Sequence, residues 1–250
     1  MRRFPVSKLP DQKTILEVFR LLSLEYPNPK TELIYDSSFQ LLIAVILSAQ
    51  CTDARVNLVT PELFRQYPTA RAMAGAKIKS LETLIHSCGF YRMKAKSIQN
   101  ASRDLITRFE GELPKTLEEL ITLAGVGRKT ASVVLNQAFD IPAIAVDTHV
   151  KRVSHRLGWT DQSSPEKIER DLKDLVPQKL WSQINGLLIL HGRKICKARK
   201  PACEACFVNT YCRYYGKEFT PIKLRDAAAP EKRSRSSRRQ SLKTHKTHTL

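Results

Sequence analysis

The sequence lacks a long apolar run, is poor in glycine and is short of acidic residues, and each shortage disfavours a class of protein. Its longest apolar run, residues 41–47, is far too short to cross a bilayer. No apolar segment follows the basic first residues, so we expect no signal peptide. Glycine supplies only 9 of 250 residues, and no alternation of β-branched and polar residues is long enough to build a sheet. Secretion, membrane insertion and a sheet-based fold are therefore disfavoured, and we expect a cytoplasmic protein.

The shortage of acidic residues leaves the chain strongly basic. Lys and Arg number 42 against 24 Asp and Glu, which gives a net charge of +18 and a pI of about 9.8. This excess predicts a polyanionic partner, and it favours nucleic acid over an anionic membrane surface or a merely solvated basic surface. From residue 227 onward, seven basic residues stand against one acidic residue with almost no apolar side chains, so we expect a disordered tail over 226–250. The rest of the chain still carries +12, so the folded body is basic as well.

Apolar residues recur at helical spacing along most of the chain, which predicts an all-α fold. The segment 38–50 is apolar almost all round and suits a helix buried in the centre. The expected helical segments are 11–25, 38–50, 78–88, 93–109, a pair within 116–138, 163–176 and 178–192.

A glycine-rich turn separates the two helices of 116–138. Gly125 and Gly127 flank Val126, and Arg128 opens the second helix at once. A tight turn before a helix N-terminus exposes backbone N–H groups that suit a phosphate. Gly125, Gly127 and Arg128 are therefore candidate DNA contacts. An ordinary turn between two helices is the alternative.

Four cysteines lie within 17 residues near the C-terminal end, namely Cys196, Cys203, Cys206 and Cys212. Thiolates this close bind a zinc ion or an iron–sulfur cluster. A structural zinc site usually takes two short Cys pairs, and this segment offers one; disulfides are disfavoured in a cytosolic chain. Basic side chains surround the first of these cysteines, and the candidate phosphate contacts among them are Arg193, Lys197, Arg199 and Lys200.

The hairpin and the loop after it resemble a known family. Residues 123–131, LAGVGRKTA, resemble the helix-hairpin-helix element of the DNA glycosylase superfamily. The usual Pro before the first hairpin Gly is Ala124 here, which should change the stiffness of the turn more than its contacts. Residues 139–149 are similar to the family's next loop, which holds an essential Asp, here Asp147. The cysteine spacing is similar to that of the [4Fe–4S] cluster in the endonuclease III branch, and the resemblance covers roughly residues 10–225.

This resemblance implies a nucleophile and an assisting carboxylate. Lys129 stands where bifunctional glycosylases carry the amine nucleophile, and Asp147 where they carry the carboxylate. An amine must be neutral to attack, and free Lys has a pKa of about 10.4. We expect partial burial beside Arg128 and a helix N-terminus to favour the neutral amine. A carboxylate stabilises positive charge on the sugar. A solvated Lys129 and an Asp147 that only caps a helix are the alternatives.

Two further segments resemble the family's loops that handle an extruded nucleotide. The position of Gln50 enters the gap left in the duplex, and Phe90 stands in the second loop, where the endonuclease III pattern usually has Leu. A capped helix end for Gln50 and core packing for Phe90 are the alternatives. The remaining thiols, Cys51 and Cys88, lie in apolar helical stretches, and we expect them to be buried and inert.

The family fold implies two all-α domains with a DNA groove between them. We expect an N-terminal segment that packs on the cluster domain, a six-helix domain, a cluster domain and the tail, over 1–30, 31–141, 142–225 and 226–250 respectively. The implied function is a monomeric bifunctional DNA glycosylase and abasic-site lyase associated with the nucleoid. It would remove oxidised pyrimidines from damaged double-stranded DNA and cleave the strand by β-elimination. A monofunctional glycosylase, a non-catalytic DNA-binding protein and a [4Fe–4S] electron carrier are the alternatives.

Overall fold

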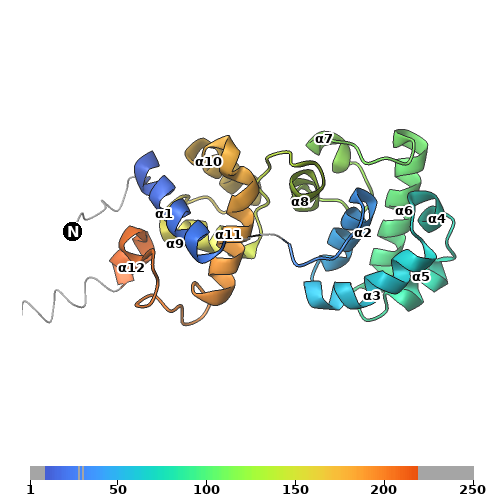
Figure 1. The fold of residues 1–250 in the computed structure, drawn as a ribbon, viewed down its shortest axis with the longest axis horizontal. Helices are drawn as coiled ribbons and strands as arrows, with labels where there is room; N and C mark the ends of the chain where they lie inside the picture. Colours follow the sequence, from blue (N-terminus) through green and yellow to red (C-terminus); the bar gives the residue numbers. More distant parts are fainter. Residues whose placement is uncertain (1–8, 28, 30, 219–250) are drawn as a thin grey trace, which may run out of the picture.

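The computed structural model describes residues 9–27, 29 and 31–218, and helices joined by loops make up this part of the chain, without a strand (Figure 1). The all-α prediction is confirmed. The predicted tail lies outside the described residues. The helices are α1 (Gln12–Glu25), α2 (Ser38–Ser48), α3 (Asp53–Gln66), α4 (Ala70–Ala74), α5 (Ile78–Leu84), α6 (Tyr91–Phe109), α7 (Leu117–Leu120), α8 (Arg128–Phe139), α9 (Thr148–Leu157), α10 (Pro165–Leu175), η1 (Gln178–Leu180), α11 (Trp181–Lys194), η2 (Asn209–Tyr211) and α12 (Arg213–Glu218).

Short polar side chains start most of the long helices. Each accepts a hydrogen bond from a backbone N–H of the first turn, which satisfies a donor that has no partner within the helix. Pro165 follows one of these caps, at a position where its missing N–H costs nothing. The capping residues are Asp11, Ser37, Thr52, Thr69, Thr116, Asp147 and Ser164.

Two separate hydrophobic cores hold the helices. One core contains buried side chains between residues 33 and 143, and the other combines residues 15–26 with residues 144–208. Figure 1 shows the same division, because α1 lies beside α9–α12 at one end and α2–α8 gather at the other. The described chain therefore starts in the half that contains the second core, forms the half that contains the first core with residues 33–143, and then completes the half in which it started. The two cores support the domain boundaries that we propose from the sequence.

Helix α2 lies at the centre of the first core. Residues 41–47 are all buried, as its all-round apolar sequence predicts. It packs against α3, α6 and α8, so it supports both the hairpin and the loop that follows its own end. The buried Lys94 of α6 donates from Nζ to the carbonyl oxygen of Leu47 at 2.8 Å, which satisfies an acceptor at the C-terminal end of α2.

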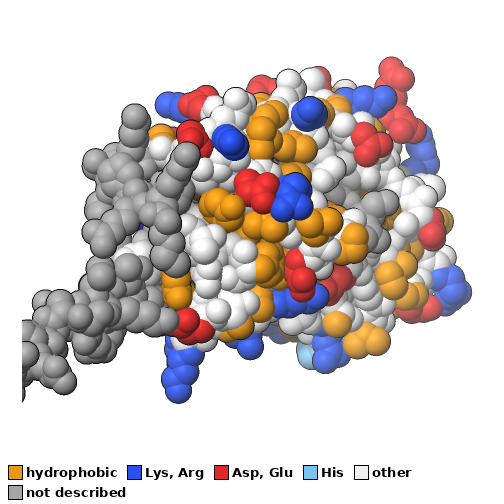
Figure 2. Space-filling model, turned by 60° about the vertical axis from the view of Figure 1, so that its left-hand side comes forward, with side chains coloured by type: hydrophobic (Ala, Val, Ile, Leu, Met, Phe, Trp, Pro, Cys, Tyr) orange, Lys and Arg blue, Asp and Glu red, His pale blue; other side chains and the backbone are white. Residues whose placement is uncertain are grey.

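Charged side chains of both signs cover the surface. On the face in Figure 2, Lys and Arg lie scattered among acidic and apolar side chains rather than in one continuous basic area. In the described part of the chain, no helix combines the length and the apolar character needed to cross a membrane.

Candidate active site

The hairpin turn between α7 and α8 is built around two glycines. Gly125 has a φ of +76°, and a Cβ there would lie 2.6 Å from the Cβ of Ser97, so only glycine fits this approach to α6. Gly127 is the N-cap of α8 and leaves the backbone open. Both glycines are exposed at the end of the turn. The turn therefore presents the N-terminus of α8 at the surface, as a phosphate-binding turn requires.

Lys129 is exposed in the first turn of α8, so the expected partial burial is wrong. The first turn of α8 faces the surface, and the apolar face of the helix begins only at Ala131. The positive charge of Arg128, which was expected to favour a neutral amine, is engaged elsewhere. Its guanidinium donates two hydrogen bonds to Glu169, from Nε at 2.6 Å and from Nη2 at 3.1 Å.

Two positively charged side chains contact the carboxylate of Glu169. Glu169 lies on α10 in the other half of the molecule, and its side chain is only 6% exposed. Nζ of Lys173 lies 2.7 Å from Oε1, the oxygen that also accepts from Nη2 of Arg128. Burial alone would raise the pKa of Glu169, but the hydrogen bonds from Arg128 and Lys173 outweigh it and hold that pKa below 4.5. The ion pair between Arg128 and Glu169 therefore joins the start of α8, which carries Lys129, to α10 in the other half of the molecule.

We expect Glu169→Gln to lower the free energy of unfolding by about 1–3 kcal/mol at neutral pH, because a buried acceptor of charged hydrogen bonds is lost. The folded pKa is depressed, so this contribution is present above pH 4.5 and is lost as pH falls through the lowered value. Thermal melts at neutral and acidic pH measure it, with the exposed Asp174→Asn of the same helix as the control. Equal melting temperatures for Glu169→Gln and wild type at neutral pH would contradict the role of the pair.

Asp147 caps α9, so the capping interpretation is confirmed. Its Oδ1 accepts from the backbone N–H groups of His149 and Val150, each at 2.8 Å. Its Oδ2 lies 3.2 Å from Nδ1 of His149, and the side chain is 14% exposed. The carboxylate is thus fixed at a helix N-terminus and still reachable from the surface, which is compatible with a catalytic role.

The loop between Lys129's helix and Asp147 is held from both sides. Residues 143–145 are buried, and the N–H of Ala145 donates to Oδ1 of Asn185 on α11 at 3.0 Å. Asn136 of α8 donates to the carbonyl oxygen of Ser182 at 3.0 Å. These hydrogen bonds of the Asn136 and Asn185 side chains join α8, the loop and α11. They therefore fix how the starts of α8 and α9 lie relative to one another.

The loop that carries Gln50 and the loop that carries Phe90 lie next to each other. Gln50 and Phe90 both adopt a left-handed backbone, with φ of 53° and 58°. A Cβ on Gly89 would lie 3.6 Å from the carbonyl oxygen of Gln50, so the two loops pass at van der Waals distance. Phe90 is 62% exposed, which rules out core packing for it, and Gln50 is exposed beyond the end of α2.

The basic side chains near the cysteines fall into two groups. Lys197, Arg199 and Lys200 are exposed. Arg193 instead forms ion pairs with the half of the molecule that contains the first core, because its guanidinium lies 3.1 Å from Glu32 and 3.7 Å from Asp53. Arg193 therefore contributes a second ionic link between the two halves of the molecule.

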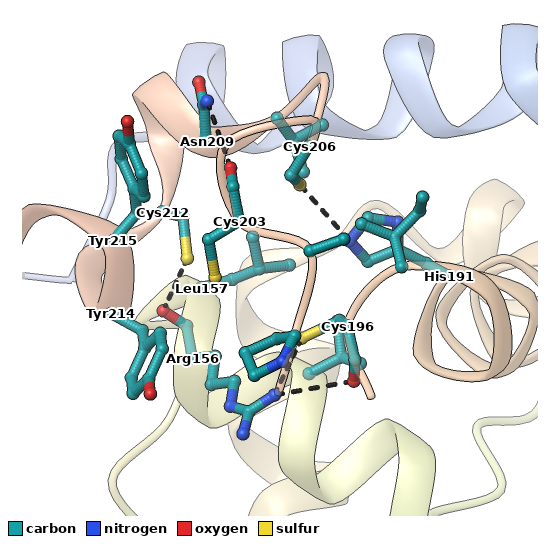
Figure 3. Close-up of a pocket in the computed structure, with 15 residues that line it drawn as sticks. Arg156, Leu157, His191, Cys196, Cys203, Cys206, Asn209, Cys212, Tyr214 and Tyr215 are labelled. Carbon is teal, nitrogen blue, oxygen red and sulfur yellow. Dashed lines mark hydrogen bonds between the residues drawn. The ribbon is translucent and has the colours of Figure 1, made fainter. Parts of the chain in front are cut away.

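Four thiols line one cavity, and hydrogen bonds fix the segments that carry them. The cysteines are free rather than disulfide-bonded, and Figure 3 shows their sulfur atoms around a common space. Arg156 of α9 donates to Sγ of Cys196 at 3.3 Å and to the carbonyl oxygen of Lys197 at 2.7 Å. Sγ of Cys212 donates to the carbonyl oxygen of Arg156 at 3.2 Å, and His191 lies with Nε2 3.6 Å from Sγ of Cys206.

The chemistry of this cavity fits a metal centre. Burial, with the neighbouring thiols as a smaller cause, raises the pKa of Cys206 to about 11, and burial likewise raises the pKa of Cys212. Such thiols become thiolates when iron or zinc binds them. Burial lowers the pKa of His191 to about 4, so its ring is neutral at physiological pH and adds no charge beside the thiolates.

Comparison with known families decides between these metals and identifies the chain. A family model described as HhH-GPD superfamily base excision DNA repair protein matches residues 43–178. A second, the iron–sulfur binding domain of endonuclease III, matches residues 196–212, which span all four cysteines. The endonuclease III of Synechocystis is 52% identical over 197 residues, which cover 78% of this chain and 90% of the relative.

The chain belongs to the endonuclease III family. It is a DNA N-glycosylase and abasic-site lyase of base excision repair, so the electron carrier and the non-catalytic binding protein are set aside. The endonuclease III of Escherichia coli is 43% identical over 199 residues, which cover 80% of this chain and 94% of the relative.

Solved structures agree with this membership. A trapped endonuclease III–DNA covalent intermediate matches with a TM-score of 0.79 and 43% identity, over 84% of this chain and 98% of that chain. A non-covalent endonuclease III–DNA complex matches with the same TM-score and 42% identity, over 87% of this chain and 100% of that chain. A thermostable thymine-DNA glycosylase, 23% identical with a TM-score of 0.74, shares the fold.

The cofactor of this endonuclease III family member is a [4Fe–4S] cluster. Cys196, Cys203, Cys206 and Cys212, which line one cavity, would hold it, and the cluster would then give the loop 197–202 a fixed attachment at both ends. Zinc and disulfides, which the sequence alone leaves open, are excluded by the matched family.

Sequence reasoning missed Glu169 and Arg156. Glu169 anchors the hairpin helix and Arg156 anchors the cluster loop. Glu169 falls in a regular amphipathic helix, and only its place among the apolar residues Ile168 and Leu172 distinguishes it from a solvated acid.

Proposed function

We propose that both activities of this enzyme run through a Schiff base on Lys129, assisted by Asp147, on duplex DNA that contains oxidised pyrimidines or abasic sites. The proposal rests on the places of Lys129 and Asp147 at the N-terminal ends of α8 and α9. Lys129 is exposed in the first turn of α8, Asp147 is fixed at the N-cap of α9, and a buried loop joins the two helices.

The chemistry needs a neutral amine and a fixed negative charge. The neutral Nζ of Lys129 attacks the sugar carbon that bears the damaged base, and the bond to the base breaks. The attacking amine loses one proton and the departing base takes up one proton. The bond between this carbon and the ring oxygen then breaks, the ring oxygen takes up a proton, and a protonated Schiff base remains on Lys129. The carboxylate of Asp147 stabilises the positive charge that develops on the sugar. Loss of a proton from the neighbouring sugar carbon then breaks the bond to the 3′ phosphate by β-elimination. Water finally releases Lys129.

The remaining site residues bind and open the duplex. The N–H groups around Gly125 and Gly127 take a phosphate at the start of α8, and the 42% exposed side chain of Arg128 contributes its positive charge while it stays paired with Glu169. Gln50 and Phe90, whose side chains are exposed, enter the duplex where the damaged nucleotide leaves the stack. The exposed cluster-loop cations Lys197, Arg199 and Lys200, with Arg193 behind them, contact further phosphates. The cluster, when bound, would supply a rigid attachment for that loop.

Borohydride trapping tests the proposal. The holoenzyme is mixed with a duplex that contains one abasic site, and borohydride reduces any Schiff base to a stable adduct. We expect a covalent protein–DNA adduct, and digestion followed by mass spectrometry should place it on Lys129. An adduct on another residue, or strand cleavage without any adduct, would overturn the assignment of Lys129.

We further propose that the enzyme acts as a monomer in the cytoplasm, associated with the nucleoid. Its excess of basic residues supports this proposal, and the tail 226–250 adds phosphate contacts that do not depend on sequence. Deletion of the tail should weaken binding to intact duplex and reduce its salt dependence. An unchanged salt dependence in a binding titration argues against a role for the tail.

A further inference from the structure

The two thiols outside the cluster lie together between the loops of Gln50 and Phe90. Cys51 directly follows Gln50, and Cys88 directly precedes Gly89, whose backbone passes the carbonyl oxygen of Gln50 at van der Waals distance. The thiols of Cys51 and Cys88 lie close enough to interact and are not joined by a disulfide. Two loops that are far apart in sequence therefore bring a pair of thiols into contact.

The two thiols differ in access. Cys88 is fully buried, whereas Cys51 is half-buried at the edge of the core. The expectation that both thiols are buried is therefore wrong for Cys51. It is wrong because α2 ends at Ser48 and the chain turns to the surface before α3 begins. Of the two thiol residues, Cys51 is therefore the one with surface exposure, and Cys88 has none.

A helix N-terminus and two positively charged side chains lie near the two thiols. Cys51 stands two residues before α3, whose N-terminus is a positive dipole end. The buried Lys94 and Arg55 of the first turn lie close enough to Cys88 to lower its pKa, although burial outweighs them. The one acid of that turn, Asp53, has its carboxylate 3.7 Å from Arg193.

We propose that Cys51 and Cys88 form an oxidisable dithiol, a modification site that reacts with low-molecular-weight disulfides and closes a bond between the Gln50 and Phe90 loops. The Cys51 thiolate attacks one sulfur of the small disulfide, which forms a mixed disulfide and releases one thiol. Cys88 gives up its proton and attacks the sulfur of Cys51, which releases the second thiol. One small disulfide is thus reduced to two thiols while the protein dithiol is oxidised to one disulfide.

The order of attack follows from the structure. Burial first, and the neighbouring Cys51 second, raise the pKa of Cys88 to about 11, so Cys88 is a poor first nucleophile. Once Cys51 carries the mixed disulfide, its sulfur lies beside Cys88, and the reaction becomes intramolecular. Cys88 therefore resolves the intermediate that Cys51 forms.

The bond has a consequence that rests on the proposed function. It ties together the two loops that we propose to enter the duplex, so they can no longer move independently as the nucleotide leaves the stack. We expect the oxidised enzyme to lose its preference for an abasic duplex over an intact duplex by about tenfold.

Peptide mapping tests the chemistry without reference to DNA. The holoenzyme is incubated with oxidised glutathione, the free thiols are alkylated, and absorption near 400 nm confirms that the cluster remains. We expect a peptide that links Cys51 to Cys88 in the wild type. Cys88→Ser should accumulate glutathione on Cys51, because the resolving thiol is gone, and Cys51→Ser should leave Cys88 free. A free Cys51 in the treated wild type, or a mixed disulfide that persists there, would refute the dithiol.

A binding titration tests the consequence. We expect oxidised wild type to lose its preference for an abasic duplex, dithiothreitol to restore it, and Cys51→Ser to keep it under the same treatment. An unchanged preference after complete linkage refutes the control of the loops. If the reduced enzyme shows no preference for the abasic duplex, the DNA contacts of the proposed function fail, whereas peptide mapping still decides the dithiol.

Discussion

Lys129→Ala abolishes both the borohydride adduct and strand cleavage at an abasic site, and it leaves binding to that site largely intact. We expect the rate of cleavage to fall by roughly three orders of magnitude or more, the scale seen when a nucleophile is removed. Binding survives because Lys129 is one exposed cation among many and the hairpin glycines stay in place. Single-turnover cleavage and a gel shift on the same duplex measure the two effects separately.

Two matched variants separate nucleophilicity from charge. Lys129→Arg keeps a cation at the start of α8, but a guanidinium stays protonated and cannot attack. We expect it to lose cleavage as fully as Lys129→Ala while binding DNA more tightly than that variant. Lys79→Ala removes an exposed lysine whose partner is Glu82, so full trapping should remain. A normal adduct in Lys129→Arg would show that another amine carries the reaction.

Local patterns in the sequence predicted most of the fold. The all-round apolar character of 38–50 placed α2 in the core, and the glycines of the hairpin marked the start of α8 at the surface. Both features depend on neighbours within a few residues, which periodicity and turn chemistry register directly. The four cysteines are likewise close in sequence, so their common cavity was predictable as well.

Contacts between distant segments were not predictable in this way. Arg128 meets Glu169 after 41 residues, and no local signal pairs one with the other. The same lack of local information explains why the sequence did not predict that Cys51 and Cys88 lie together, and why Lys129 was expected to be partly buried. Burial of a side chain in the first turn of a helix depends on what packs above it, and here Arg128 turns away to the other half of the molecule.

Asp147→Asn separates the cap of α9 from catalysis. Asn is as good an N-cap as Asp, so the two backbone N–H groups now held by Oδ1 keep their acceptor and stability should change little. The negative charge is lost, however, and with it the stabilisation of positive charge on the sugar. We expect single-turnover base release to slow by roughly 10²–10³-fold, the cost of removing one group that stabilises transition-state charge.

Comparison with Asp147→Ala shows whether slow base release in Asp147→Asn comes from the lost charge or from a lost cap. It removes both the charge and the cap, so it should lose catalysis to the same extent and also destabilise the protein by about 0.5–2 kcal/mol. A thermal melt then reports the cap, and base release reports the charge. If Asp147→Asn released base at the wild-type rate while Asp147→Ala did not, the carboxylate would act only through the cap of α9. Slow base release in both variants, with a lowered melting temperature in Asp147→Ala alone, means that the residue caps α9 and also supplies the charge at the sugar.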